Sequence, residues 1–226
     1  MNVRGCVVSN NKINFKLFKP FGSTIAKAEL PIELFKDFNQ DLKTIRASEE
    51  LSKEHNFRHK LAGQIHQEFL ISHEPMSKWK AHFFDPIIKA YAESHLKKHQ
   101  VEKIVITAAW YVVQKPGDYN PNHTHTNFSD YQMNPDLSCV GYLRIPEKMK
   151  SFKNAKEHFD TSGHIEFIEG SESMFNDSNY LIKPELRTWY LFPSNLRHCV
   201  YPFFTEDEND ERISFSFNAK IIFKNL

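Results

Sequence analysis

The chain has 226 residues, of which 40% are hydrophobic and 25% are charged, a composition that excludes a disordered chain and suffices for one domain with a sizeable core. Its 29 Lys and Arg residues are balanced by 28 Asp and Glu residues, which excludes a protein that holds nucleic acid through a strongly basic surface. No apolar run approaches the roughly 20 residues of a membrane-spanning helix, and we expect no signal peptide, because the first residues lack its apolar segment.

The first hundred residues are predicted to be mainly helical. Residues 3–21 are predicted to form a short strand followed by turns. From Pro31 onward, apolar residues recur every three or four positions, which predicts an amphipathic helix that begins near this proline. A second helix is predicted over residues 57–71. A third is predicted over residues 77–99, and Pro86 should kink or split it.

The second half of the chain is β-branched and aromatic. Residues 101–114 are apolar on both faces, which predicts a buried central strand. Residues 212–223 alternate between apolar and polar side chains, as in a strand with one face of each kind. Further strands are predicted over residues 138–145, 163–169 and 188–192. Helices followed by strands predict an α+β, mainly β fold in which helices back one face of an antiparallel sheet pair.

Three histidines are candidate metal ligands. His123 and His125 follow a turn and are separated by one residue, so both imidazoles can point the same way on an extended chain and reach one metal ion. His198 comes far later, beside the end of the predicted strand 188–192. Each of them taken alone is more simply a surface or core histidine. The three together, each beside a strand end, favour a metal site at the mouth of a β-sandwich.

Arg212 and Ser214 lie on the polar face of the last predicted strand, two residues apart. A guanidinium group with an adjacent hydroxyl group suits a carboxylate, which can accept two parallel hydrogen bonds from arginine and one from serine. The alternative is an exposed sheet face with a charge at its edge.

The motifs around these residues resemble the Fe(II)- and 2-oxoglutarate-dependent oxygenase superfamily. The segments that carry the resemblance, within roughly residues 100–222, are GDYNPNHTHTN, SCVGYLRIP, GHIEFIEG, WYLFPSNLRHCVYPF and ERISFSFN. The branch they resemble most is that of small oxygenases of phages and marine bacteria, distantly related to prolyl hydroxylases. The resemblance implies one domain over residues 1–226, with backing helices in about 1–100 and a double-stranded β-helix (a cupin-like jelly roll) in about 101–226.

The resemblance also implies the metal ligands. His123 matches the first ligand of Fe(II) in the superfamily, and His198 matches the distal one. The position between them usually holds Asp or Glu, whereas this chain has His125, which the close branch tolerates. Three imidazoles leave the iron more positive than two imidazoles and a carboxylate. Asp118 and Asp130 flank the histidine pair and are alternative sources of the missing carboxylate.

The cosubstrate contacts follow from the same resemblance. Arg212 matches the residue that binds the distal carboxylate of 2-oxoglutarate, and Ser214 matches its hydroxyl partner. Tyr142 matches a strand position that often adds a phenol hydrogen bond, although a plain core tyrosine is almost as well supported there. Asn127 and Trp110 are placed in the pocket by their position in the sequence alone.

The implied activity is that of a dioxygenase that uses Fe(II), 2-oxoglutarate and O₂. Such an enzyme couples the decarboxylation of 2-oxoglutarate to succinate with the hydroxylation of a C–H bond, here of an amino-acid or protein side chain. One alternative is a cupin-like metal protein with a three-histidine site that does not use 2-oxoglutarate. Another is a non-catalytic jelly-roll binding module.

The remaining expectations concern the surroundings of the protein. Its three cysteines, Cys6, Cys139 and Cys199, are too few and too scattered for a disulfide framework, which favours a reducing compartment, the cytoplasm. The expected partner is a small-molecule or peptide substrate, with neither nucleic acid nor membrane. The sequence leaves the oligomeric state open, and a homodimer is one option.

Overall fold

The structure is a computed structural model, and it describes residues 14–18, 22–58, 63–96, 100–126, 134–150, 160–171, 173–174 and 177–224. Within these residues the chain forms two antiparallel β-sheets and a layer of helices. The helical elements are α1 (Ile32–Ala47), α2 (Glu49–Glu54), α3 (His73–Trp79), a π-helical segment (Lys80–Phe84) and α4 (Asp85–His95). None of the described helices is both long and apolar enough to span a membrane.

The large sheet has seven strands, each antiparallel to its neighbours. In spatial order they are β1 (Phe15–Phe18), β2 (Ile25–Glu29), β9 (Thr188–Pro193), β6 (Leu137–Arg144), β11 (Arg212–Phe223), β4 (Val101–Gln114) and β3 (Gln67–Leu70). The small sheet has the order β5 (Asn120–His123), β10 (Arg197–Val200), β7 (Ile165–Ile168) and β8 (Asn179–Ile182). The predicted jelly roll with backing helices is thus confirmed.

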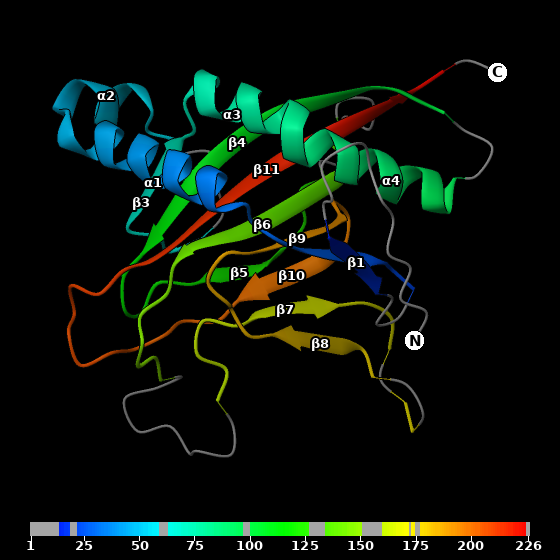
Figure 1. Ribbon diagram of the computed structural model, residues 1–226. Helices are drawn as coiled ribbons and strands as arrows, with labels where there is room; N and C mark the ends of the chain where they lie inside the picture. Colours follow the sequence, from blue (N-terminus) through cyan, green and yellow to red (C-terminus); the bar gives the residue numbers. More distant parts are fainter. Residues whose placement is uncertain are drawn as a thin grey trace.

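The large sheet lies between two layers. Figure 1 shows α1, α3 and α4 along one of its faces and the small sheet on the other. The alternation in β11 explains this arrangement, because its apolar residues face the helices. The Phe215 ring lies 4.9 Å from Phe38 of α1, and the Phe217 ring lies 4.8 Å from Phe84 of the π-helical segment. The polar residues of β11 face the small sheet, where they can line a site between the two sheets.

Gly141 in β6 shows how closely the large sheet is packed. It pairs with Phe215 of β11, and a Cβ atom at this position would overlap the Phe215 ring. We therefore expect Gly141→Ala to lower the free energy of unfolding by about 1–3 kcal/mol, the usual cost of overpacking a core. Urea denaturation monitored by circular dichroism measures this change. An unchanged denaturation midpoint would contradict the close approach of the two strands.

Most of the predicted elements are present. The helix predicted from Pro31 is α1, whose buried residues are Leu34, Phe38, Leu42 and Ile45, spaced as an amphipathic helix requires. The strands predicted over 101–114, 138–145, 163–169, 188–192 and 212–223 correspond to β4, β6, β7, β9 and β11. The strand predicted within residues 3–21 corresponds to β1, and residues 1–13 and 19–21 of that prediction lie outside the described residues.

The helix predicted over residues 57–71 is wrong. The described part of this segment contains β3, which pairs with β4 in the register Gln67 opposite Val113 and Phe69 opposite Tyr111. Pairing with β4 satisfies one side of the β3 backbone, and Phe69 is buried in the core that includes the helical layer. On the other side, the Phe57 N–H donates to the Glu68 carbonyl and the Leu70 N–H donates to the His55 carbonyl. The long-range pairing with β4 overrides the apolar spacing, which alone favours a helix.

The helix predicted over residues 77–99 is split, as Pro86 suggests. The π-helical segment separates α3 from α4, and Pro86 stands in the first turn of α4, where its missing N–H costs no helical hydrogen bond. Residues 97–99 lie outside the described residues. Because β1 and β3 are the two edges of the large sheet, the predicted helical N-terminal part also supplies both of those edges.

Candidate metal centre

Strands β5 and β10, which are neighbours in the small sheet, bring the three predicted histidines together. His123 is the last residue of β5 and lies directly opposite His198 of β10 in the antiparallel register. His125 follows two residues after His123, and its backbone N–H donates to the carbonyl of Ser194 over 2.9 Å. One ligand atom from each of the three histidines lies within 4.8 Å of the others. These residues are therefore close enough to bind a single metal ion.

The orientation of two of these rings is fixed by the backbone. The Nδ1 atom of His123 lies 2.7 Å from the carbonyl oxygen of Pro121, and that of His198 lies 2.9 Å from the carbonyl oxygen of Leu196. A carbonyl oxygen only accepts hydrogen bonds, so each Nδ1 carries the proton and each Nε2 presents a lone pair. This is the usual support of metal-binding histidines, whose second nitrogen is held by a hydrogen bond.

Burial keeps the three imidazoles neutral. It lowers the pKa of His125 to about 3, with a smaller contribution from the nearby His123, and it lowers the pKa of His198 well below its usual range. Burial also lowers the pKa of His123, although the bond to Pro121 opposes the shift. Metal ions bind the neutral form of histidine. Three neutral imidazoles fit a transition-metal ion such as Fe(II), for which imidazole is a suitable ligand.

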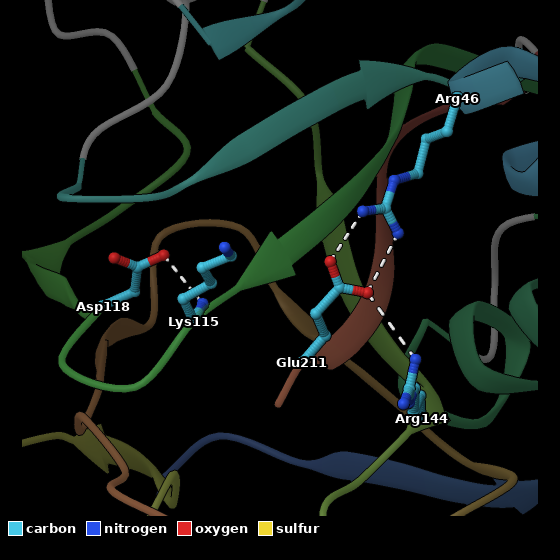
Figure 2. A network of polar contacts seen from close by, with 5 residues as sticks. All are labelled: Arg46, Lys115, Asp118, Arg144 and Glu211. Carbon is cyan, nitrogen blue, oxygen red and sulfur yellow. Dashed lines mark hydrogen bonds and ion pairs between the residues drawn. The ribbon is translucent and has the colours of Figure 1, made fainter. Parts of the chain in front are cut away.

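The two aspartates considered as additional ligands do not join this cluster in the described residues. The Asp118 carboxylate accepts hydrogen bonds from the backbone N–H groups of His66 and Lys115, over 2.7 and 2.9 Å, and Figure 2 shows the second of these contacts. It closes the turn between β4 and β5, and the described metal-ligating cluster comprises the three histidines alone. Asp130 lies outside the described residues.

The histidines line a cavity of about 380 Å³ between the two sheets, and the predicted cosubstrate residues lie beside it. Arg212, Ser214 and Trp110 line the same cavity, from the two adjacent strands β11 and β4. Tyr142 of β6 pairs with Ser214 and is fully buried rather than lining the cavity. Asn127 lies outside the described residues.

Arg212 is a buried cation with unused hydrogen-bonding capacity. It is 1% exposed, and its Nη1 donates to the carbonyl of Gly163 over 2.8 Å. Its guanidinium lies 5.4 Å from the centre of the Tyr142 ring. Neither the Nε of Arg212 nor the hydroxyl of Tyr142 has a hydrogen-bond partner among the described residues. Unpaired buried donors are costly, so this pair fits an anionic ligand that would accept from both, such as a carboxylate.

A partly buried group of ion pairs, which the sequence did not reveal, holds the start of β11 in place. Both terminal nitrogens of Arg46 in α1 donate to Glu211, over 2.9 and 2.6 Å, and Arg144 of β6 approaches Glu211 within 3.6 Å (Figure 2). Burial alone would raise the pKa of the Glu211 carboxyl, but these arginines hold it below its usual range. Since Glu211 directly precedes Arg212, the contact ties Arg212, the residue predicted to bind the cosubstrate, to the helical layer.

Sequence reasoning also missed a carboxyl group inside the cavity. Glu68 of β3 is 3% exposed and lines the cavity together with Phe57. Both residues fall in the segment predicted to be a helix, where a glutamate is ordinarily exposed. The only sequence signal available was a lone acidic residue beside apolar ones, which is too common to indicate a site.

Three solved structures are similar to this fold. A prolyl-4-hydroxylase of Pseudomonas putida is 14% identical, with a TM-score of 0.56, over 87% of this chain and 91% of that chain. A viral collagen prolyl hydroxylase of Paramecium Bursaria Chlorella virus-1, in a 2OG complex, is 14% identical, with a TM-score of 0.54, over 91% and 100%. A prolyl hydroxylase of Trichoplax adhaerens, in complex with a hypoxia inducible factor peptide fragment, is 14% identical, with a TM-score of 0.56, over 91% and 83%. The chain therefore has the fold of these proteins.

No curated protein matches the sequence. The similar solved structures do not test the narrower resemblance to oxygenases of phages and marine bacteria, so that resemblance stays a prediction. Residues 108–218, about half of the chain, match the family described as "Putative 2OG-Fe(II) oxygenase". The matched region contains the three clustered histidines and the buried arginine beside them. The chain belongs to this family of 2OG-Fe(II) oxygenases.

Proposed function

We propose that the protein is an Fe(II)- and 2-oxoglutarate-dependent dioxygenase that hydroxylates an amino-acid side chain, free or within a peptide. The observation that carries this proposal is the combination, around one cavity, of three neutral histidines and a buried arginine with an unpaired donor. The histidines suit a metal ion and the arginine suits an anion. The proposed reaction needs Fe(II) and the anionic cosubstrate 2-oxoglutarate bound next to each other.

The residues divide this work between them. His123, His125 and His198 would hold Fe(II) through their ring nitrogens. Arg212 would donate to the distal carboxylate of 2-oxoglutarate, with the hydroxyl of Ser214 on the same wall of the cavity. When bound, Fe(II) and 2-oxoglutarate supply the oxidising chemistry, in which one oxygen atom of O₂ enters succinate, the other enters the hydroxylated product, and CO₂ is released.

The Tyr142 hydroxyl is a further donor toward the same carboxylate. Burial raises the pKa of Tyr142 to about 12, so the group stays protonated and can donate a hydrogen bond at any physiological pH. Its buried hydroxyl has no partner among the described residues, and the guanidinium of Arg212 lies over its ring. A carboxylate that accepts from both residues would satisfy both donors at once.

The charge balance of the site gives the cosubstrate a second role. Three imidazoles bring no negative charge, so they leave the +2 charge of a metal ion uncompensated, and Arg212 adds a further positive charge nearby. The two carboxylates of 2-oxoglutarate would provide the compensation. We therefore expect 2-oxoglutarate and the metal ion to bind with positive cooperativity.

A peptide substrate is supported by the fold, since a solved structure with the same fold holds a peptide fragment. The cytoplasmic location belongs to the proposal as well, because Cys139 and Cys199 are free thiols in the structure.

The test is the formation of succinate from 2-oxoglutarate, measured with and without Fe(II) against a panel of amino acids and peptides. We expect turnover that requires Fe(II), and a weak visible absorption band when Fe(II) and 2-oxoglutarate are added without oxygen. Folded protein that shows neither the band nor succinate would overturn the proposal. Metal binding without any stabilisation by 2-oxoglutarate would instead indicate the cupin-like alternative.

A further inference from the structure

Glu68 has no role in the reaction as described above, yet its carboxyl group is buried in the reaction cavity. It is the only acidic residue among the described residues that line this cavity. Its Oε1 atom has no hydrogen-bond partner in the described part of the chain. A buried carboxyl oxygen without a partner is costly to keep, which points to a ligand that supplies the missing partner.

No cation among the described residues is paired with the Glu68 carboxyl group. Burial raises the pKa of Glu68 to about 7; the charge of the exposed Arg58 acts in the opposite direction, and that of Asp118 adds to the increase. No ion pair joins Arg58 to Glu68 among the described residues. A cation bound against the carboxyl group would favour its ionised form and compensate its charge.

Two aromatic rings line the cavity that Glu68 shares with the three histidines. Phe57 and Trp110 both line the cavity, and their ring centres lie 5.8 Å apart. The Trp110 ring centre also lies 5.9 Å from that of His125. Aromatic faces attract ammonium and guanidinium groups and pack well against the alkyl chain that carries them. Trp110 therefore offers an apolar wall beside His125, in the cavity that Glu68 also lines.

The register of the large sheet places Glu68 and the cosubstrate residues on different strands that line the cavity. Glu68 pairs with Val112 of β4, and Val112 pairs with Ser214 of β11. Neighbouring strands are about 4.8 Å apart, so about 10 Å separate the backbones of Glu68 and Ser214. The cavity thus has a buried cation, Arg212, at the end that suits 2-oxoglutarate, and a buried carboxyl group, Glu68, on the strand two positions away.

We propose that Glu68 binds a positively charged group of the substrate, and that the substrate is accordingly a lysine- or arginine-type side chain, free or in a peptide. This inference rests on the proposed function and narrows its substrate class. In this arrangement the charged end of the substrate side chain contacts Glu68, and its alkyl part lies along Trp110. One carbon atom of that alkyl part lies near the three histidines. A prolyl residue within a peptide has no charge and leaves Glu68 without a partner.

The inference is tested by isothermal titration calorimetry without oxygen, with and without Fe(II) and 2-oxoglutarate. The probes are capped Gly-Lys-Gly and Gly-Arg-Gly peptides, free lysine and arginine, and a capped peptide with norleucine, which has the lysine alkyl chain without the charge. We expect a cationic probe to bind at least about tenfold more tightly than the norleucine peptide, since hydrogen bonds to charged groups contribute that much. Comparison of the affinities for the free amino acids and for the peptides shows whether the site prefers a free amino acid or a residue within a peptide.

The matched variants are Glu68→Gln, which keeps the shape but removes the charge, and Glu102→Gln on the exposed part of β4. We expect the first to abolish the preference for the cation and the second to preserve it. Equal binding of the charged and norleucine peptides by the unchanged protein, or a preference that survives in Glu68→Gln, would overturn the inference. The comparison of the charged and norleucine peptides in the unchanged protein needs no variant, so it decides the question even if Glu68→Gln fails to fold.

The two proposals fail in different ways. Succinate formation without any preference for a cationic probe would refute the role of Glu68 and leave the oxygenase intact. A cation preference that depends on Glu68, in protein that forms no succinate with any probe, would refute the oxygenase and with it the role of Glu68 in substrate choice.

Discussion

Fe(II) binding is expected to be lost when His198 is replaced by alanine. This histidine is buried, and its Nε2 lies 3.3 Å from the Nε2 of His125, so it is a central member of the proposed ligand set. Loss of a residue that merely orients a metal ligand lowers affinity by about 10- to 100-fold, and loss of a ligand itself should cost at least about 100-fold. Metal content after anaerobic Fe(II) loading and desalting measures the effect. Succinate formation should stop in the same variant.

The matched control is His82→Ala. His82 is exposed in the π-helical segment, in the helical layer on the opposite side of the large sheet from the small sheet. It should bind Fe(II) as the unchanged protein does. Equal metal content in His198→Ala and His82→Ala would show that the three clustered histidines are not the metal site.

The second large effect concerns the cosubstrate. We expect Arg212→Met to weaken 2-oxoglutarate binding by at least about 30-fold, because removing one partner of a buried charged pair costs about 2 kcal/mol or more. Metal content should be unchanged, since none of the metal ligands hydrogen-bonds to Arg212 in the described residues. Anaerobic calorimetry with 2-oxoglutarate measures the affinity, and Arg197→Met, a change of an exposed arginine on β10, is the control.

A stability measurement separates this role from a structural one. The free protein keeps the Arg212 guanidinium buried with an unpaired Nε, so an apolar side chain of similar length relieves that cost but leaves the buried Gly163 carbonyl without its donor. These two effects oppose each other, so we expect the free energy of unfolding to change by no more than about 1–2 kcal/mol. A binding role predicts lost affinity for 2-oxoglutarate with stability retained. Arg212→Met protein that is much less stable, and that binds 2-oxoglutarate normally, would show that the residue is structural.

The parts of the fold that the sequence predicts are those with a local periodic signal. The alternation in β11 and the apolar run near the end of β4, residues 110–113, are visible in the sequence because there each strand presents its two faces to two different layers. The same alternation carries Arg212 and Ser214 into the cavity, so their proximity was predictable. The histidine pair was predictable for the same reason, because residues two apart on an extended chain share a face.

The parts that escape the sequence depend on contacts between distant segments. Glu68 reaches the cavity only because β3 pairs with β4, and nothing local in residues 57–71 distinguishes that edge strand from a helix. Glu211 is buried beside Arg46 of the helical layer, which pairs with it from a segment far away in the sequence. In both cases an acidic residue that composition assigns to the surface becomes part of the interior through tertiary structure.

The register of β5 on β10 has a consequence for how the protein holds together. His123 and His198 face each other across two short strands whose pairing is interrupted by an irregularity between His198 and Val200. An ion bound to both residues would cross-link chain segments that are far apart in sequence and that few backbone hydrogen bonds connect. Because the unfolded chain cannot present these ligands together, the binding energy of the ion would add to the cooperativity of folding, and removing it with a chelator would loosen the small sheet first.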